Sequence, residues 1–196
     1  MEEADDSPAY HNRPAAGLLL APGSFAQTSQ PNAPSRAAPA GTGTATVALN
    51  QEDQTFVKEA GIGGMAEVEL SKLAQKSENA DVKSFADRMV RDHTKANQEL
   101  TTIATGLGVD APKALDPEHE RMRQKLRGLH GKSFDEQYMQ GMVEDHNKVV
   151  KLFKDEERSD SNNALKQFAQ KTLPVLQEHQ TMALELSNKV SQASAR

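Results

Sequence analysis

Four long segments of this chain carry apolar or small residues at alternating spacings of three and four, the repeat of an α-helix that buries one face. The segments span residues 51–77, 80–107, 133–158 and 161–190. No useful length of sequence alternates between apolar and polar residues as a half-buried strand does. Helices of this kind bury their apolar faces against one another, so the sequence predicts an all-α, ferritin-like four-helix bundle.

Residues typical of helix ends bound these segments. Asn50 is predicted to cap the first helix, and Asp160 the fourth. The Ser-Phe-Asp-Glu sequence at 133–136 is typical of a capping box and predicts the start of the third helix at Ser133. Gly106 and Gly108 are expected to end the second helix.

The connection between the second and third helices, residues 108–132, is long enough to cross the bundle. It is predicted to hold a short helix that begins near Pro117 and to leave the second and third helices parallel. Glycines at 61, 63 and 64 are expected to permit close packing or a bulge in the first helix, and Pro174 is expected to kink the fourth.

The N-terminal region has a different composition. Residues 1–49 hold six of the nine prolines and no lysine, which predicts a disordered Ala/Pro-rich tail before a bundle spanning residues 50–192. The apolar run 15–21, followed by the small residues Ser24 and Ala26, is typical of the end of a signal peptide. Acidic residues before that run oppose a working signal, so a signal remnant and a plain tail both stay open.

Composition excludes several function classes. The chain has no cysteine, which excludes disulfides, thiolate metal sites and cysteine nucleophiles. Its net charge of −5 lacks the basic excess of a nucleic-acid binder, so no nucleic-acid partner is expected. No apolar run approaches the length of a membrane helix, so no membrane-spanning segment is expected.

Each apolar stripe is interrupted by one residue that can bind a metal. These residues are Glu67, His93, His146 and His179, one near the centre of each helix. In a bundle they would converge at mid-depth, where an unpaired carboxylate costs several kcal/mol. Three neutral imidazoles and a carboxylate around one divalent ion would satisfy all four, which predicts a site for Zn, Cu or Fe. A buried hydrogen-bond network without metal is the competing interpretation.

Residues near the histidines fit a metal site as well. Asp92, Asp145 and Glu178 each precede a histidine and would either orient an imidazole on a neighbouring helix or form a solvated flank. Three methionines are predicted to share one layer beside the histidines, either as packing or as part of a soft site for copper. They are Met89, Met142 and Met182.

The same residues carry a resemblance to a known family. Its segments here include Phe56–Ala60 with Glu67, Met89–His93, and Leu173-Pro174 followed by His179. Over residues 51–190 the sequence is similar to an exported bacterial family catalogued as domain of unknown function 4142 and grouped with ferritin-like bundles. The resemblance implies a four-helix bundle in the periplasm or in association with the outer membrane and the envelope.

Di-iron ferritin-like enzymes pair each active-site histidine with a glutamate three residues earlier. Here Val90, Val143 and Leu176 occupy those positions, so a single-metal site is expected and no catalytic residue is assigned. The sequence therefore predicts an exported bundle that binds a divalent metal, with metal buffering or stress protection as its role. A single-metal enzyme and a metal-free envelope interaction or structural protein are the alternatives.

Overall fold

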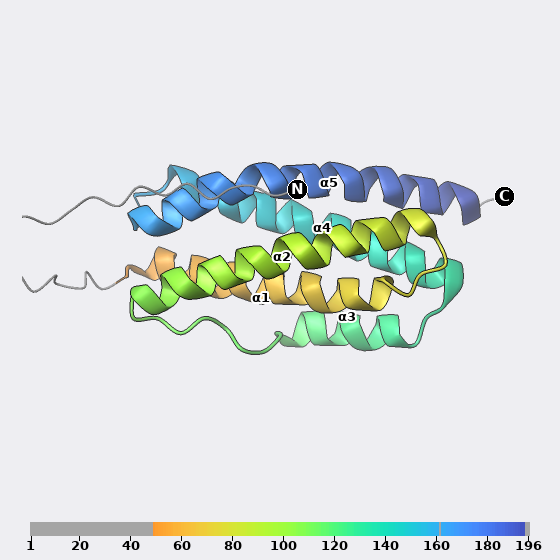
Figure 1. The fold of residues 1–196 in the computed structure, drawn as a ribbon, viewed down its shortest axis with the longest axis horizontal. Coiled ribbons are helices and arrows are strands. Elements are labelled where there is room, and N and C mark those ends of the chain that lie inside the picture. The colour runs from red at the N-terminus through yellow and green to blue at the C-terminus, as the bar shows by residue number, and fades with distance from the viewer. Residues whose placement is uncertain (1–48, 161, 195–196) are drawn as a thin grey trace, which may run out of the picture. The chain divides into compact units, whose positions relative to one another are not determined.

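The computed structural model describes residues 49–160 and 162–194, which form five α-helices and no strand within those ranges. The helices are α1 (Gln51–Ala74), α2 (Ala80–Gly106), α3 (Pro117–Arg127), α4 (Gly131–Arg158) and α5 (Asn163–Ser194) (Figure 1). The all-α prediction is confirmed, including the short extra helix. Residues 1–48 of the predicted tail, with the signal-like run, lie outside the described residues. Leu49, the last residue of the predicted tail, is buried, so the bundle begins one residue earlier than predicted.

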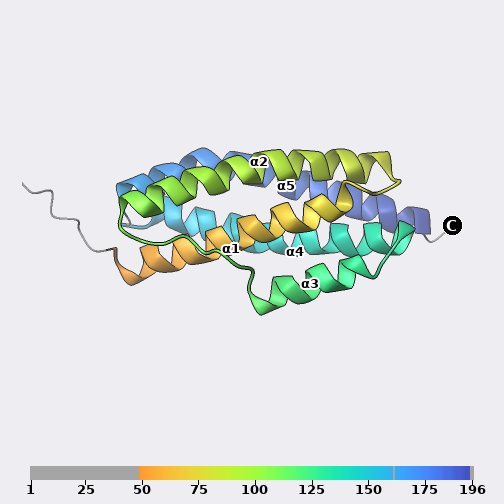
Figure 2. The ribbon, with the colours of Figure 1, turned by 60° about the horizontal axis from the view of Figure 1, so that its bottom comes forward.

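Two helical hairpins, α1–α2 and α4–α5, pack side by side to form the bundle. α1 contacts α2 and α4, and α5 contacts the same two helices. The chain leaves the end of α2, runs back along the bundle and continues through α3, so α4 starts at the end where α2 started (Figures 1 and 2). α2 and α4 are therefore parallel, as predicted, and each of the four long helices is antiparallel to both of its neighbours.

The bundle interior consists of two apolar clusters, called here the first and second half-cores. The first half-core joins the start of α1 to the end of α2, the end of α4 and the start of α5, with Phe56, Leu100, Phe153 and Phe168 among its members. The second joins the opposite ends of the same helices. Its members include Leu70, Phe85, Tyr138, Met142 and Ala183. Fully burying each such large side chain contributes roughly 2–3 kcal/mol, which makes the half-cores the main source of stability.

The starts of α1 to α3 follow the sequence, whereas α1 ends at Ala74, three residues before the predicted end at 77. The Asn50 side chain accepts a hydrogen bond from the Asp53 N–H at 2.7 Å, which confirms the predicted cap. α2 ends at Gly106, and α3 begins with Pro117 after Asp116 as its cap. These ends are specified by residues close in sequence, which is why they were predictable.

The predicted starts of the last two helices are wrong by two residues each. α4 begins at Gly131, because the Phe134 N–H already bonds to the His130 carbonyl, so the capping box at 133–136 lies inside the helix. Gly131 has a φ of 55°, a conformation that glycine adopts readily. α5 begins at Asn163 and is capped by Asn162 rather than Asp160, through a hydrogen bond from the Ala164 N–H.

Close packing at the glycines of α1 is confirmed at two positions. A Cβ at Gly61 would lie 2.7 Å from Pro112 Cδ, and one at Gly64 would lie 2.1 Å from Asn97 Oδ1. A Cβ at Gly63 would meet nothing within 4 Å. Pro112, in the segment after α2, therefore packs directly against α1 at Gly61. Asn97 of α2 does the same at Gly64.

Candidate metal centre

The four predicted site residues come together between the two half-cores. α1 supplies Glu67, α2 His93, α4 His146 and α5 His179, and each is at most 4% exposed. We call these four residues the polar layer. Their convergence follows from their central places in four helices of similar length, and it gives the bundle one buried ionisable cluster at mid-depth.

The Glu67 carboxylate faces two imidazoles through their Nδ1 atoms. Its Oε2 lies 2.8 Å from Nδ1 of His93, and its Oε1 lies 3.3 Å from Nδ1 of His146. Nδ1 of His146 also lies 2.8 Å from the backbone carbonyl of Met142, one turn earlier on α4. These contacts hold both rings from their Nδ1 sides and leave their Nε2 sides turned to the rest of the layer.

His179 is held from the outside by a different carboxylate. Its Nε2 donates to Asp92 Oδ2 at 2.9 Å, and Asp92 also pairs with Arg88 at 3.3 Å. The other nitrogen of the ring, Nδ1, lies 3.3 Å from Nε2 of His93. The prediction that the acid before a histidine orients an imidazole on a neighbouring helix is thus confirmed for Asp92.

These outer contacts decide which ring nitrogens carry protons. With protons on Nδ1 of His93 and His146 and on Nε2 of His179, every outward N–H has an acceptor. The remaining nitrogens then carry lone pairs, and one nitrogen from each ring lies within 4.8 Å of the other two. Nε2 of His146 has no hydrogen-bond partner among the described residues. Three buried imidazoles therefore lie close enough together to hold one cation between them.

The electrostatics of the polar layer favour an ionised Glu67 beside neutral His146 and His179. Burial acts to raise the pKa of Glu67, but the adjacent His93 and His146 outweigh it and lower the pKa to about 2. Burial lowers the pKa of His146, and burial together with His93 lowers that of His179 to about 4. Near neutral pH these imidazoles need no deprotonation before they bind a metal.

The three methionines lie on one side of the polar layer, as predicted. Met89 and Met142 are fully buried in the second half-core, and Met182 packs against it. The Met182 sulfur also lies 3.3 Å from a guanidinium nitrogen of Arg88. The three methionines therefore serve as packing residues here. Their polarizable sulfur atoms lie on the second half-core side of the polar layer.

The other two acids that precede histidines point elsewhere. Glu178 pairs with Arg88 at the surface. Asp145 faces His119 of α3, with Oδ1 3.8 Å from Nε2. Of the two alternatives expected for these acids, Glu178 therefore forms a solvated flank, and Asp145 faces an imidazole outside the polar layer. Asp116 lies 2.9 Å from the other His119 nitrogen. Asp145 and Asp116 raise the pKa of His119 to about 9, so His119 is a cation that joins the start of α3 to α4.

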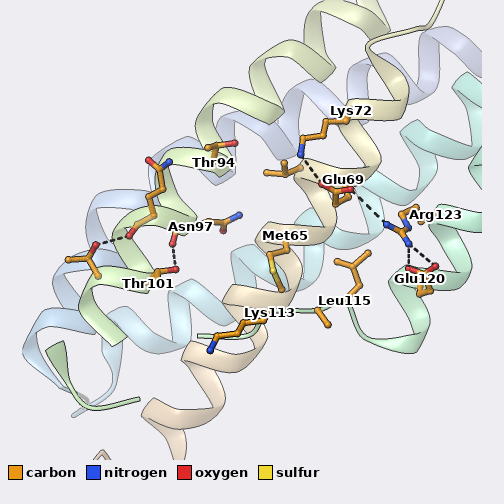
Figure 3. Close-up of a pocket in the computed structure, with 14 residues that line it drawn as sticks. Met65, Glu69, Lys72, Thr94, Asn97, Thr101, Lys113, Leu115, Glu120 and Arg123 are labelled. Carbon is orange, nitrogen blue, oxygen red and sulfur yellow. Dashed lines mark hydrogen bonds and ion pairs between the residues drawn. The ribbon is translucent and has the colours of Figure 1, made fainter. Parts of the chain in front are cut away.

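Two hollows lie near the polar layer, one inside the bundle among the four long helices and one at the surface between α1 and α2. A void of about 20 Å³ is lined by Glu67, His93 and Asn97, among others. A surface groove of about 850 Å³ runs between α1, α2 and the crossover, and Asn97 also lines it (Figure 3). Charged groups on the α3 side of this groove pair with one another, since Arg123 contacts both Glu69 and Glu120 (Figure 3).

The sequence of this chain matches the profile of a known protein family. The profile of the family described as "Domain of unknown function (DUF4142)" matches residues 38–186, which include the whole polar layer. The chain belongs to the DUF4142 family. The match confirms the resemblance inferred from the sequence and covers α1, α2 and α4 in full and α5 as far as residue 186.

Two solved structures of DUF305 proteins have a fold similar to that of this chain. A DUF305 fragment from Deinococcus radiodurans is 16% identical with a TM-score of 0.61, and the alignment covers 71% of this chain and 98% of that one. A predicted secreted DUF305 protein from Streptomyces coelicolor is 15% identical with the same TM-score, covering 71% and 94%. No curated protein matches the chain. At these identities the likeness concerns the fold alone.

Proposed function

We propose that this DUF4142 protein is an exported helical bundle that binds one divalent transition-metal ion in its polar layer. His93, His146 and His179 are the proposed ligands, and metal buffering is the proposed role. The observation that carries the proposal is the convergence of three buried imidazoles, with one nitrogen of each within 4.8 Å of the others. Hydrogen bonds to the Met142 carbonyl and to Asp92 orient His146 and His179, and the Glu67 carboxylate faces His93.

The spacing of the nitrogens suits a tetrahedral ion. Two nitrogens bound to zinc at about 2.0–2.1 Å lie about 3.4 Å apart in a tetrahedron. Nε2 of His93 and Nδ1 of His179 are 3.3 Å apart, close to that spacing. A nitrogen of His146 lies within 4.8 Å of the other two, so its ring must move inward to complete a set of three. Without a cation, a proton between Nε2 of His93 and Nδ1 of His179 would satisfy that pair, but Nε2 of His146 would still lack a partner among the described residues, which favours a cation in the layer.

Glu67 has a distinct part in this site. Its oxygens face Nδ1 of His93 and of His146, the contacts that a carboxylate makes when it orients histidine ligands and raises their basicity. Its negative charge also offsets part of the charge of the ion. Direct ligation by Glu67, as expected from the sequence, stays a prediction.

Ligand chemistry narrows the choice of metal. Imidazole-rich sites favour copper and zinc over ferrous iron, by the usual order of divalent affinities. Zn and Cu are therefore the preferred ions, and Fe is the weaker candidate. The methionines of the second half-core add to the case for copper only if one of them turns toward the ion.

Room beside the polar layer favours binding over catalysis. The void beside Glu67 and His93 measures about 20 Å³, enough for one water molecule but not for an organic substrate. A water molecule there would lie beside Glu67 and His93, whereas His146 and His179 do not line this void. The small size of this void favours metal storage or buffering over an enzymatic role.

The proposed export follows from the family and its structural neighbours. The resemblance implies an envelope location, and one neighbour of the same fold is a predicted secreted protein. Among the described residues, no helix is long and apolar enough to span a membrane. Export to the periplasm or the outer-membrane surface would place the bundle where it meets incoming metal ions.

Metal titration of the full chain, purified without a histidine tag, tests this function. We expect one equivalent of Zn²⁺ or Cu²⁺ per chain and a higher melting temperature in its presence. His146→Ala should remove most of that increase. His130→Ala is the matched control, because His130 is an exposed histidine at the start of α4. Equal affinity in the wild type and His146→Ala, or no binding by the wild type, would overturn the proposal.

A further inference from the structure

A second cleft reaches the polar layer from the α4 side of α1. It measures about 430 Å³ and lies between α1, α4 and the first turn of α3. Glu67 lines both this cleft and the buried void that contains His93. We infer that this α1–α4 cleft is the route by which a divalent cation enters and leaves the polar layer, an inference that rests on the proposed metal site.

Charge in the α1–α4 cleft suits a cation. Five carboxylates line it, against two lysines and His119. The carboxylates are Glu59, Glu67, Asp116, Glu118 and Asp145. A cleft with a net negative charge concentrates cations and speeds their association. The carboxylate at its inner end, Glu67, is also the group in contact with two of the proposed ligands.

The groove on the α1–α2 side is a poorer route. Its charged lining consists of two carboxylates against two lysines and an arginine, so it carries a positive balance. Between this groove and the void lies the neutral Asn97, packed tightly against Gly64 of α1. A divalent cation would meet repulsion at the surface and a close packing contact beneath it.

Gly63 provides a way to obstruct the α1–α4 cleft without disturbing the bundle. It lines the cleft, and a Cβ built on it meets nothing within 4 Å. It also lies four residues before Glu67, so a side chain at position 63 would occupy the same face of α1, one turn away. A larger residue there would fill the cleft while replacing glycine within a helix, a change that favours the helix.

The test is the rate of Zn²⁺ uptake by the metal-free full chain, followed by stopped-flow competition with a coloured zinc chelator. Gly63→Leu should take up and release Zn²⁺ at least about tenfold more slowly, with its equilibrium affinity unchanged. Gly106→Leu is the matched control, because a Cβ there also meets nothing within 4 Å but the residue lies at the far end of α2. It should behave as the wild type.

A second pair of variants tests the charge of the cleft. Glu59→Lys should slow uptake about threefold or more at low ionic strength, and salt should reduce the difference. Glu185→Lys makes the same change on an exposed position of α5 and should leave the rate unaltered. These variants keep the inference testable if Gly63→Leu does not fold.

Failure of this inference differs from failure of the metal site itself. A wild type that binds no metal would overturn both. Wild-type uptake rates in Gly63→Leu and in Glu59→Lys would overturn only the route, since the metal would then enter elsewhere. A loss of equilibrium affinity in Gly63→Leu that accounts for the slower uptake would also overturn it, because Gly63 would then shape the site.

Discussion

His119 and His179 each lie beside a carboxylate, yet their pKa values move in opposite directions. His179 is fully buried between His93 and Asp92, and burial followed by the neighbouring imidazole lowers its pKa to about 4. His119 lies nearer the surface between Asp145 and Asp116, which raise its pKa to about 9. Burial and the number of charged neighbours, rather than a carboxylate as such, decide whether a histidine is a neutral ligand or a cation.

The two histidines consequently hold different parts of the molecule. His179 belongs to the polar layer and offers a lone pair to the interior. His119 bridges its own helix cap, Asp116, and the α4 residue Asp145, and the adjacent Glu118 pairs with Lys148 of α4 at 2.9 Å. These contacts attach α3 to the bundle, so we expect His119 to affect stability and His179 to affect metal binding.

The largest expected effect is a loss of metal affinity on substitution of His179 that substitution of His119 does not cause. His179→Ala removes one of three proposed ligands and should lower Zn²⁺ affinity about 10³-fold, or about 4 kcal/mol. His119→Ala should leave the affinity within about twofold of the wild type, well under 1 kcal/mol. Calorimetric titration measures both. Equal losses in the two variants would remove the distinction between ligand and structural cation.

Opposite pH dependences should follow in the metal-free protein. Between pH 6.5 and about 4 the unfolded chain binds the proton of His179 more readily than the folded chain does, so acidification lowers the free energy of unfolding. Between pH 6.5 and about 9 the folded chain retains the proton of His119 more readily, so a rise in pH lowers that free energy. Each effect amounts to at most about 3 kcal/mol.

Urea unfolding across the pH range measures these slopes. His179→Gln should flatten the acid side alone, and His119→Gln the alkaline side alone. If His119→Gln leaves the alkaline slope intact, another group causes it and His119 is not the cation inferred from its contacts.

A smaller effect concerns the acids that precede the histidines. Asp92→Asn weakens the hydrogen bond that orients His179 and should lower metal affinity about tenfold. Asp145→Asn makes the same change one residue before His146, but Asp145 faces His119, so it should reduce stability and leave the affinity unaltered. Competition titrations of the two variants test the pair. A tenfold loss in Asp145→Asn would show that Asp145 does serve the polar layer.

The smallest effect is expected for the N-terminal region. Removing residues 1–48 should change the melting temperature by less than about 3 °C, roughly 1 kcal/mol for a bundle of this size. The cut must precede Leu49, because Leu49 is buried in the first half-core. A larger fall in differential scanning calorimetry would show that the preceding residues contribute to folding.

The helical repeat explains why so much of this molecule was predictable. Spacings of three and four place residues on one face of a helix, so the bundle, its connectivity and the four members of the polar layer followed from the sequence. Which atoms of Glu67 and the histidines meet depends on side-chain rotamers, and the repeat does not specify them. The contact between His119 and Asp145 depends on how α3 docks against α4, and only the short spacing from Asp116 to His119 hinted at a structured position.

The polar layer also constrains how the helices can slide past one another. Shifting α1 by one turn, about 5.4 Å, would move Glu67 out of reach of His93 and into a half-core, where an unpaired carboxylate costs several kcal/mol. The half-cores by themselves, built of leucine, phenylalanine, methionine and alanine, would tolerate such sliding far better. Glu67 therefore fixes the register of the bundle, because this setting of α1 is the one that keeps its carboxylate in contact with His93 and His146.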